Sequence, residues 1–416
     1  MAITPQGLVG YWEAPYLFKH DGTYYLAYAR GNPRTGGNPA TIDYATASDP
    51  LGPWTYRGRI LDTVTNTTTN HPAIVEFNGQ WYIVYHDGML PGGGEFRRSV
   101  CIDKLFFNDD GTIQKVTQTL SAAARRPVAA YPLDQGAGVT AADATGNGWD
   151  ATLVNRATWV PGVFGSAVRL DGTDQYLRLP TGIVWNMYDF TVACWVRLDA
   201  TGGHVFDLGT GPTVHMYVTP QSSGGTVRFA ITTGGAFREQ RVDGTAPLPT
   251  GRWTHVAVMK SALTVTLYVN GVQVGQNPAV FLYPARLGNT PNNWFGRSQD
   301  PTDPYLAGAI DDIQIHQRAL DDDELARLVL FGLITSLADY LEGQPINAGV
   351  RTSLTTKLDT IAALLRRGQP GEALAVLDDL VSEVEDLRGS QLTDAQADEL
   401  VASAALIRST ILRSTT

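Results

Sequence analysis

The feature that most constrains the fold is a pair of short aromatic segments, each of which follows a dipeptide that reverses the chain. Residues 24–28 read Tyr-Tyr-Leu-Ala-Tyr, and residues 81–85 read Trp-Tyr-Ile-Val-Tyr. The turn dipeptides of this part of the chain are Asp21-Gly22, Asn78-Gly79 and Asp110-Gly111. Asp-Gly and Asn-Gly are preferred in β-hairpin turns, which require positive φ. Residues 1–120 are therefore predicted to form antiparallel strands arranged as repeated β-hairpins.

The next part of the chain, residues 128–330, also predicts short strands, but with apolar and polar residues in alternation and glycine-rich spacing. The clearest predicted strands are 167–170, 190–198, 254–258 and 265–269. Such strands bury one face each and are typical of a two-sheet sandwich. Between the two β-rich parts, residues 121–127 are small and polar and end at a proline, so they are predicted to be a linker.

The last part, residues 331–416, has leucines and other apolar residues at intervals of three or four, which predicts amphipathic helices. Acidic residues at 321–324 open the first helix-like stretch, and Thr393-Asp-Ala-Gln396 predicts a capping box ahead of the last one. Gly368 and Gly389 are predicted at helix ends. The fold class expected is mainly β and multi-domain, with a small C-terminal helical bundle.

Composition excludes several classes of function. A count of 9 Trp, 17 Tyr and 13 Phe with only 17% charged residues favours strands over long helices. The net charge of −10 without a basic run argues against nucleic acid as a partner. No apolar stretch approaches the roughly 18 to 20 residues that span a membrane, and the first seven residues show no signal peptide. Cys101 and Cys194 are predicted to be buried, unpaired thiols.

One carboxyl group has surroundings suited to acid catalysis. Glu13 lies in Tyr-Trp-Glu-Ala-Pro, between aromatic residues and a proline that lacks a backbone donor. Desolvation there would disfavour the charged carboxylate, which suits a general acid near neutral pH. A surface or structural glutamate is the competing interpretation.

Residues 13–28 and 44–54, with 70–86, 96–100 and 108–113, together resemble glycoside hydrolase family 43. The resemblance implies the C-terminal part of a five-bladed β-propeller whose members are inverting enzymes acting on arabinose-, xylose- or galactose-containing plant polymers. It implies that Glu13 is the general acid and that His71 contributes, through water, to a calcium site. It further implies that Arg97 or Arg98 contacts the sugar.

Each of these residues has a structural alternative. His71 precedes Pro72 at a predicted strand start and could serve only in a turn. Arg97 and Arg98 are adjacent on a predicted strand, so they would face opposite sides and at most one would enter a pocket. His86 and Asp87 either line a cleft or close a turn.

An inverting glycosidase also needs a second carboxylate, about 6.5–9.5 Å from the acid, to activate water. In the family that residue lies upstream of the Glu-x-Pro motif, and no acid of this sequence matches it. A blade takes about 50 to 60 residues, so the segment supplies about two of five blades. We therefore expect the chain to be truncated and inactive alone, with exposed, adhesive blade faces.

The remaining parts carry two further resemblances. Residues 168–172, 190–195, 253–256, 267–272 and 308–313 resemble laminin G-like, concanavalin-type jelly rolls, which implies sugar binding or calcium, with Asp171 and Asp311 as candidate ligands. An Asp-Gly turn alone would explain Asp171. Trp185 and Trp294 are candidates for stacking on sugars or for packing. The last 85 residues resemble a helical module of secreted bacterial carbohydrate enzymes, so the extracellular space or the surface of a bacterium is the expected location.

Two hypotheses for function follow. In the first, the chain is part of an α-L-arabinofuranosidase or β-xylosidase that acts on plant cell-wall polysaccharide such as arabinan or arabinoxylan, with calcium as the only cofactor expected. In the second, the chain is a carbohydrate-binding or adhesion fragment that acts through its jelly roll.

Overall fold

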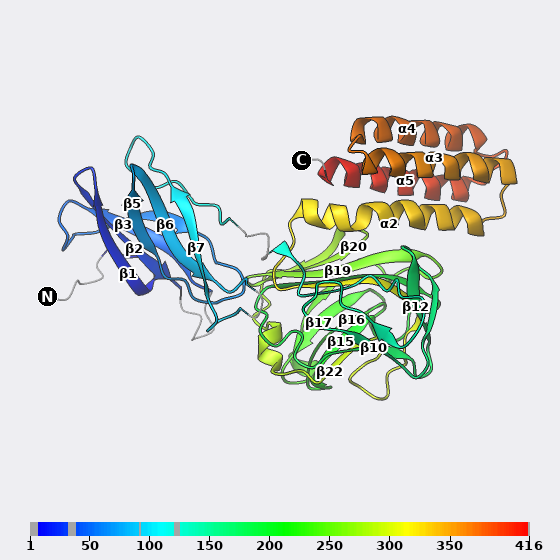
Figure 1. Cartoon of the computed structure of the whole chain (residues 1–416), viewed down its shortest axis with the longest axis horizontal. Coiled ribbons are helices and arrows are strands. Elements are labelled where there is room, and N and C mark those ends of the chain that lie inside the picture. The colour runs from blue at the N-terminus through cyan, green and yellow to red at the C-terminus, as the bar shows by residue number, and fades with distance from the viewer. Residues whose placement is uncertain (1–6, 32–38, 91–92, 120–124, 415–416) are drawn as a thin grey trace.

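The computed structural model describes residues 7–31, 39–90, 93–119 and 125–414. Two small sheets, a sandwich of two large sheets and four helices follow one another along the chain, and the helices lie over one face of the sandwich (Figure 1). The expected fold class, mainly β with a C-terminal helical part, is confirmed. Among the described residues, none of the helices has both the length and the apolar character needed to cross a membrane.

The described residues between 7 and 119 form two antiparallel sheets, which we call the blade segment. The first sheet has the order β1-β2-β3-β4 and the second β5-β6-β7. Their bounds are β1 Tyr11–His20, β2 Thr23–Arg30, β3 Thr41–Ala47, β4 Thr55–Leu61, β5 Ala73–Phe77, β6 Gln80–Asp87 and β7 Ser99–Leu105. Asp21 and Asn78, each with the glycine that follows, have positive φ as the hairpin turns require. Phe18, Ile42 and Ile83 belong to the core between the two sheets.

The sandwich consists of two antiparallel sheets. One has the order β18-β17-β16-β15-β22-β13-β10-β9, and the other has the order β11-β12-β23-β14-β19-β20-β21, with β8 beside β23. The strands are β8 Ala129–Tyr131, β9 Thr140–Ala141, β10 Ala151–Val154, β11 Thr158–Pro161, β12 Ser166–Asp171, β13 Tyr176–Leu179, β14 Phe190–Leu198, β15 Phe206–Gly211, β16 Val214–Thr219, β17 Arg228–Thr232, β18 Gln240–Asp243, β19 Trp253–Ser261, β20 Thr264–Val269, β21 Val272–Asn277, β22 Asn292–Phe295 and β23 Ala307–His316. Two short 3-10 helices, η2 Ala236–Arg238 and η3 Pro284–Leu287, lie in the connections.

The helical part shares its core with the sandwich. The helices are α2 Asp322–Gly343, α3 Ala348–Arg366, α4 Pro370–Leu387 and α5 Asp394–Ser414. Trp195 on β14 and Trp253 on β19 belong to the same buried cluster as Val329 and Leu333 of α2. The β11–β21 sheet is therefore covered on both faces, which explains why β14 and β19 are buried along almost their whole length.

The helix ends follow the predicted signals. Asp321 and Glu324 form a capping box at the start of α2, and Thr393 and Gln396 exchange the equivalent hydrogen bonds ahead of α5. Gly368 and Gly389 both have φ of 70° just after α3 and α4. Local side-chain chemistry thus sets where these helices begin and end.

Polar contacts attach the blade segment to the sandwich. Asn66 is fully buried, and its Nδ2 donates to the carbonyl of Gly88 at 2.8 Å while its Oδ1 accepts from the backbone N–H of Tyr188 at 3.0 Å. Gln317 Nε2 donates to the carbonyl of Met89 at 2.7 Å, and the Asn186 amide donates to that of Gly93. Gly88, Met89 and Gly93 all follow β6, so the junction holds these residues against the sandwich.

The cysteines, the linker and the domain boundaries were also predicted from the sequence. Cys194 is buried and Cys101 partly buried, and both are free thiols as predicted. Residues 121–124 of the predicted linker lie outside the described residues. The predicted domain boundaries stay predictions, although α2 runs unbroken across residue 330.

A glycine in α2 permits the close approach of the helix to the sheet. A Cβ built on Gly332 would lie 2.1 Å from Trp195 Cζ2, whereas one on Gly343 of the same helix would meet nothing within 4 Å. We expect Gly332→Ala to destabilise the protein by about 1 to 3 kcal/mol, because either the ring or the helix must shift. Gly343→Ala is the control and should leave the free energy of unfolding unchanged or raise it. Equal effects of the two changes in urea unfolding would contradict this packing.

Candidate active site

Glu13 lies at an irregularity of β1. The register of β1 against β2 shifts on both sides of Glu13, and the next residue, Ala14, has a φ of 58°. Such a bulge redirects a side chain from the regular alternation of a strand. Glu13 Oε1 lies 3.1 Å from Nε2 of His71, which precedes β5 in the second sheet, and both side chains are partly exposed. The fold thus brings together two of the predicted site residues, from different blades.

His86, at the end of β6, completes the cluster on the other side of His71. The His71 and His86 rings meet edge to face, with centroids 5.5 Å apart. Burial lowers the pKa of His86 to about 4, and the positive charge of Arg98 acts in the same direction. His86 is therefore neutral near neutral pH. The sequence left open whether His86 lines a cleft or closes a turn. The structure places its ring beside that of His71.

Arg97 and Arg98 do not lie on a strand, and that expectation was wrong. Gly94 and Arg97 exchange backbone hydrogen bonds across a tight turn, and β7 begins only at Ser99. Gly94 has a φ of 156°, and a Cβ there would collide with the side chain of Asn186. The chain turns at Glu95 and Phe96, so Arg97 ends the turn and Arg98 follows it before β7. Both guanidinium groups are exposed, and the charge of Arg98 contributes to the lowered pKa of His86.

Around the cluster, several buried polar atoms have no hydrogen-bond partner among the described residues. They are Thr69 Oγ1, both amide atoms of Asn70, and His86 Nε2. Native structures satisfy most such atoms, with protein, water or ligand. Glu95 borders them and accepts hydrogen bonds from the backbone N–H and the hydroxyl of Thr68. Sequence reasoning missed Asn70 and Glu95, because neither stands in a pattern that marks it.

The other acids of the blade segment are engaged elsewhere. Asp43 is fully buried and binds Arg30, Thr41 and Tyr56, while Asp103 accepts from the hydroxyl of Tyr85 at 2.6 Å. The turn acids considered from the sequence were Asp21, Asp49, Asp109 and Asp110. Within the described residues, no second carboxylate shares a hydrogen bond or ion pair with Glu13 or His71.

In the sandwich, the two candidate calcium ligands do not meet. Asp171 caps a turn by accepting from the N–H of Thr173, and this hydrogen bond lowers its pKa. Asp311 is fully buried, accepts from the N–H groups of Phe164 and Asp312, and has its pKa raised to about 7 by burial. Asp171 pairs with Ala307, four residues from Asp311 along β23, which is about 13 Å.

These residues therefore do not form a calcium-binding set. In the described part of the chain, no three acidic, histidine or cysteine side chains come together in a way that could hold a metal ion. The calcium expectation stays a prediction, and no chemical step is derived from it.

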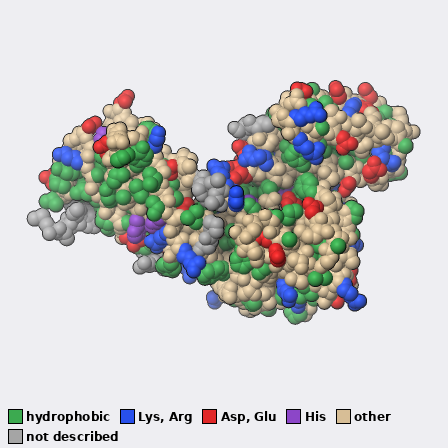
Figure 2. All heavy atoms as spheres, in the orientation of Figure 1, with side chains coloured by type: hydrophobic (Ala, Val, Ile, Leu, Met, Phe, Trp, Pro, Cys, Tyr) green, Lys and Arg blue, Asp and Glu red, His purple; other side chains and the backbone are tan. Residues whose placement is uncertain are grey.

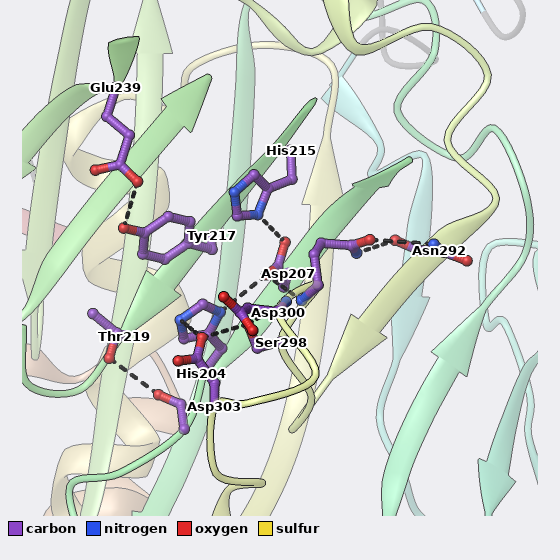
Figure 3. A network of polar contacts seen from close by, with 12 residues as sticks. His204, Asp207, His215, Tyr217, Thr219, Glu239, Asn292, Ser298, Asp300 and Asp303 are labelled. Atoms are coloured by element: carbon purple, nitrogen blue, oxygen red, sulfur yellow. Dashed lines mark hydrogen bonds and ion pairs between the residues drawn. The ribbon is translucent and has the colours of Figure 1, made fainter. Parts of the chain in front are cut away.

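A polar network on the sandwich was not foreseen. Asp207 on β15 is fully buried, and its two oxygens lie 3.0 Å from His204 Nδ1 and 2.8 Å from His215 Nδ1 (Figure 3). The Tyr217 ring stacks on both imidazoles, and its hydroxyl donates to Glu239. Met216 and Val218 of β16 face the core, so the alternating His215 and Tyr217 must face outward. That alternation was the signal available in the sequence.

Trp185 and Trp294 have different surroundings. Trp185 is 51% exposed, whereas Trp294 is 9% exposed and lies against Arg297, whose guanidinium carbon is 4.2 Å from the ring centroid. Packing therefore accounts for Trp294, and Trp185 remains available to a ligand.

Two parts of the chain are similar to known protein families. Residues 3–113 match the family model of glycosyl hydrolases family 43, and residues 171–326 match that of the Concanavalin A-like lectin/glucanases superfamily. A xylosidase/arabinosidase of Bacteroides ovatus is 39% identical over 103 residues, which is 25% of this chain and 30% of that protein. An arabinoxylan arabinofuranohydrolase of Bacillus subtilis is 38% identical over 121 residues, covering 25% of this chain and 24% of the relative.

Two solved structures extend the comparison. A β-xylosidase/α-arabinofuranosidase from a compost metagenome, in complex with xylotriose, is 44% identical over 27% of this chain and 32% of its own, with a TM-score of 0.24. Domain 4 of an extracellular arabinanase from Geobacillus stearothermophilus, in complex with arabinotriose, is 24% identical over 49% of this chain and 98% of its own, with a TM-score of 0.42.

The two arginines can be distinguished by titration. We expect Arg98→Gln to raise the pKa of His86, because the guanidinium charge disfavours the imidazolium. Arg97→Gln is the matched control and should leave that pKa where it is. NMR titration of the histidine ring protons measures both, and a response to Arg97 alone would contradict the placement of these side chains.

The matched relatives are much longer than the segment that they share with this chain. The chain spans between 20% and 37% of the length of the curated relatives it matches. The chain therefore resembles glycosyl hydrolases family 43 over residues 3–113 and the Concanavalin A-like lectin/glucanases superfamily over residues 171–326.

Proposed function

We propose that the blade segment is part of an inverting glycoside hydrolase that removes arabinofuranosyl or xylosyl units from plant polysaccharide, with Glu13 as the general acid. The observation that carries this proposal is the contact between Glu13 and His71, made between two blades whose sequence matches the family. The relatives named xylosidase/arabinosidase and arabinoxylan arabinofuranohydrolase support the substrate class.

In this proposal, protonated Glu13 donates to the glycosidic oxygen as the bond to the sugar breaks. His71 positions the carboxyl group through the 3.1 Å contact. His86, which is neutral near neutral pH, adds no positive charge beside His71. The unpartnered polar atoms of Thr69, Asn70 and His86 are suited to bind sugar hydroxyls or water.

We further propose that the chain alone lacks turnover. Inversion needs a second carboxylate to activate water on the opposite side of the sugar, and the described acids of the blade segment other than Glu13 are bound in other contacts or lie in turns. Asp43, buried among Arg30, Thr41 and Tyr56, illustrates why these acids are unsuitable as bases.

An exposed apolar face on the β5–β7 sheet supports an incomplete propeller. Val75, Phe77, Val100 and Ile102 are between 40% and 74% exposed, and pairing with β6 puts them on one face. Figure 2 shows hydrophobic side chains gathered over the blade segment. Monomeric proteins rarely leave such a face open, so further blades are the cover we propose.

The first test is activity on nitrophenyl α-L-arabinofuranoside and β-xyloside. We expect no hydrolysis by this chain above the background rate, because the water-activating base is missing. Robust turnover by the wild-type chain that is lost in Glu13→Gln would show that a base is present, and would contradict the proposed incompleteness while supporting Glu13 as the acid.

The second test concerns the exposed face. We expect the chain to self-associate, and Val100→Thr combined with Ile102→Lys to reduce this association, because charge on an edge strand opposes strand pairing and apolar contact. Val272→Thr, at a 45% exposed position on the sandwich edge strand β21, is the control. Sedimentation velocity measures the effect, and a wild-type chain that stays monomeric on concentration would refute it.

A further inference from the structure

A cavity of about 350 Å³ lies at the junction of the blade segment and the sandwich. Five segments of the chain line it: the residues after β6, the chain leading into β8, the loop between β9 and β10, the loop between β13 and β14, and Gln317 after β23. Its volume is that of a small-molecule site, and such sites are commonly found between domains.

Two tryptophans form the aromatic part of the lining. Trp149 is held by its backbone, since its N–H donates to Asp143 and its carbonyl accepts from the hydroxyl of Tyr131 at 2.6 Å. Trp185 is half exposed, and its backbone N–H donates to Gly182 at 3.1 Å. In the described structure, neither indole N–H has a hydrogen-bond partner. Trp185 therefore offers an apolar face to a ligand, and both indoles offer a donor, whereas the Trp149 ring also packs against the core of the sandwich.

The polar lining has free acceptors and no carboxylate. The amide nitrogen of Asn147 donates to the carbonyl of Val128 at 2.9 Å, and that of Asn186 donates to Gly93, so each amide keeps its oxygen for other contacts. Arg126 is exposed and supplies donors. Aromatic rings with amides and a guanidinium match a compact ligand that has apolar ring faces and many hydroxyl groups.

We propose that this cavity binds a short pentose oligosaccharide, a segment of the polysaccharide on which the proposed glycosidase acts. The ligand class rests on the proposed function, whereas the site rests on the cavity itself. Trp185 stacks on a sugar ring, and Trp149, Asn147 and Asn186 hydrogen-bond its hydroxyls. Both modules are needed, because Met89 and Gly93 of the blade segment close one wall.

The loop between β6 and β7 connects this cavity to the Glu13 cluster. Met89 and Gly93 line the cavity, and within the next few residues Glu95 binds Thr68 and Arg98 lies near His86. Residues of the same connection thus contribute to the cavity and to the surroundings of the acid. The cavity would supply binding energy remote from the reacting bond.

Calorimetric titration of the whole chain with xylotriose and with arabinotriose tests the proposal. We expect one of the two to bind, and Trp185→Ala to weaken that binding about tenfold or more, because a stacking surface is lost. Trp185→Tyr should restore part of it. Phe237→Ala, at a fully exposed position on η2, is the control and should bind like the wild type.

Further variants locate any binding that is seen. Binding that persists in Trp185→Ala and Asn147→Ala but is lost in Glu13→Gln would place the sugar at the acid and overturn the proposal. Loss in His215→Ala alone would place it at the Asp207 network, with the same consequence, and so would the absence of heat from the wild-type chain. The readout is binding without turnover, so a lack of hydrolysis leaves it unaffected.

Discussion

The buried amide of Asn66 is the interaction on which the arrangement of both candidate sites depends. It joins the carbonyl of Gly88 to the backbone of Tyr188 and lies next to Gln317. Removing one partner of a buried hydrogen bond costs about 1–3 kcal/mol, and here the cost would fall on a contact between modules. Gly88 is confined as well, since a Cβ there would lie 2.3 Å from the Asn66 carbonyl oxygen. The loop that follows β6 therefore has little freedom at its start.

Residues that follow β6 contribute to both candidate sites. Glu95 and Arg98 border the Glu13 cluster, while Met89 and Gly93 form a wall of the cavity. The sandwich is itself rigid, because α2 covers the outer face of one of its sheets and shares a core with it. A blade segment with an exposed apolar face is thus attached to a well-packed sandwich.

Local features were predictable because neighbouring residues determine them. The positive φ of Asp21 and Asn78 and the capping box of Thr393 and Gln396 follow from side chains a few positions apart. The contact of Glu13 with His71 joins residues 58 positions apart, and the family resemblance implied a role for each of them but not their contact. Arg97 and Arg98 were misplaced because the chain turns at Glu95 and Phe96, and regular pairing with β6 begins only at Ser99.

The same limit applies to the sandwich. Asp171 and Asp311 both carry carboxylates, yet backbone N–H groups satisfy them and strand register keeps them apart. Asp207 had no motif, and it gathers two histidines only because β15, β16 and the chain before β15 meet on one face. The junction cavity forms where segments distant in sequence meet, so no local sequence pattern predicts it.

Calorimetric unfolding tests most directly whether the blade segment and the sandwich form one unit around Asn66. The account predicts that the wild-type chain unfolds with the blade segment and the sandwich in a single transition, and that Asn66→Ala separates a blade transition at lower temperature. Two well-separated transitions in the wild-type chain, unchanged in Asn66→Ala, would contradict it.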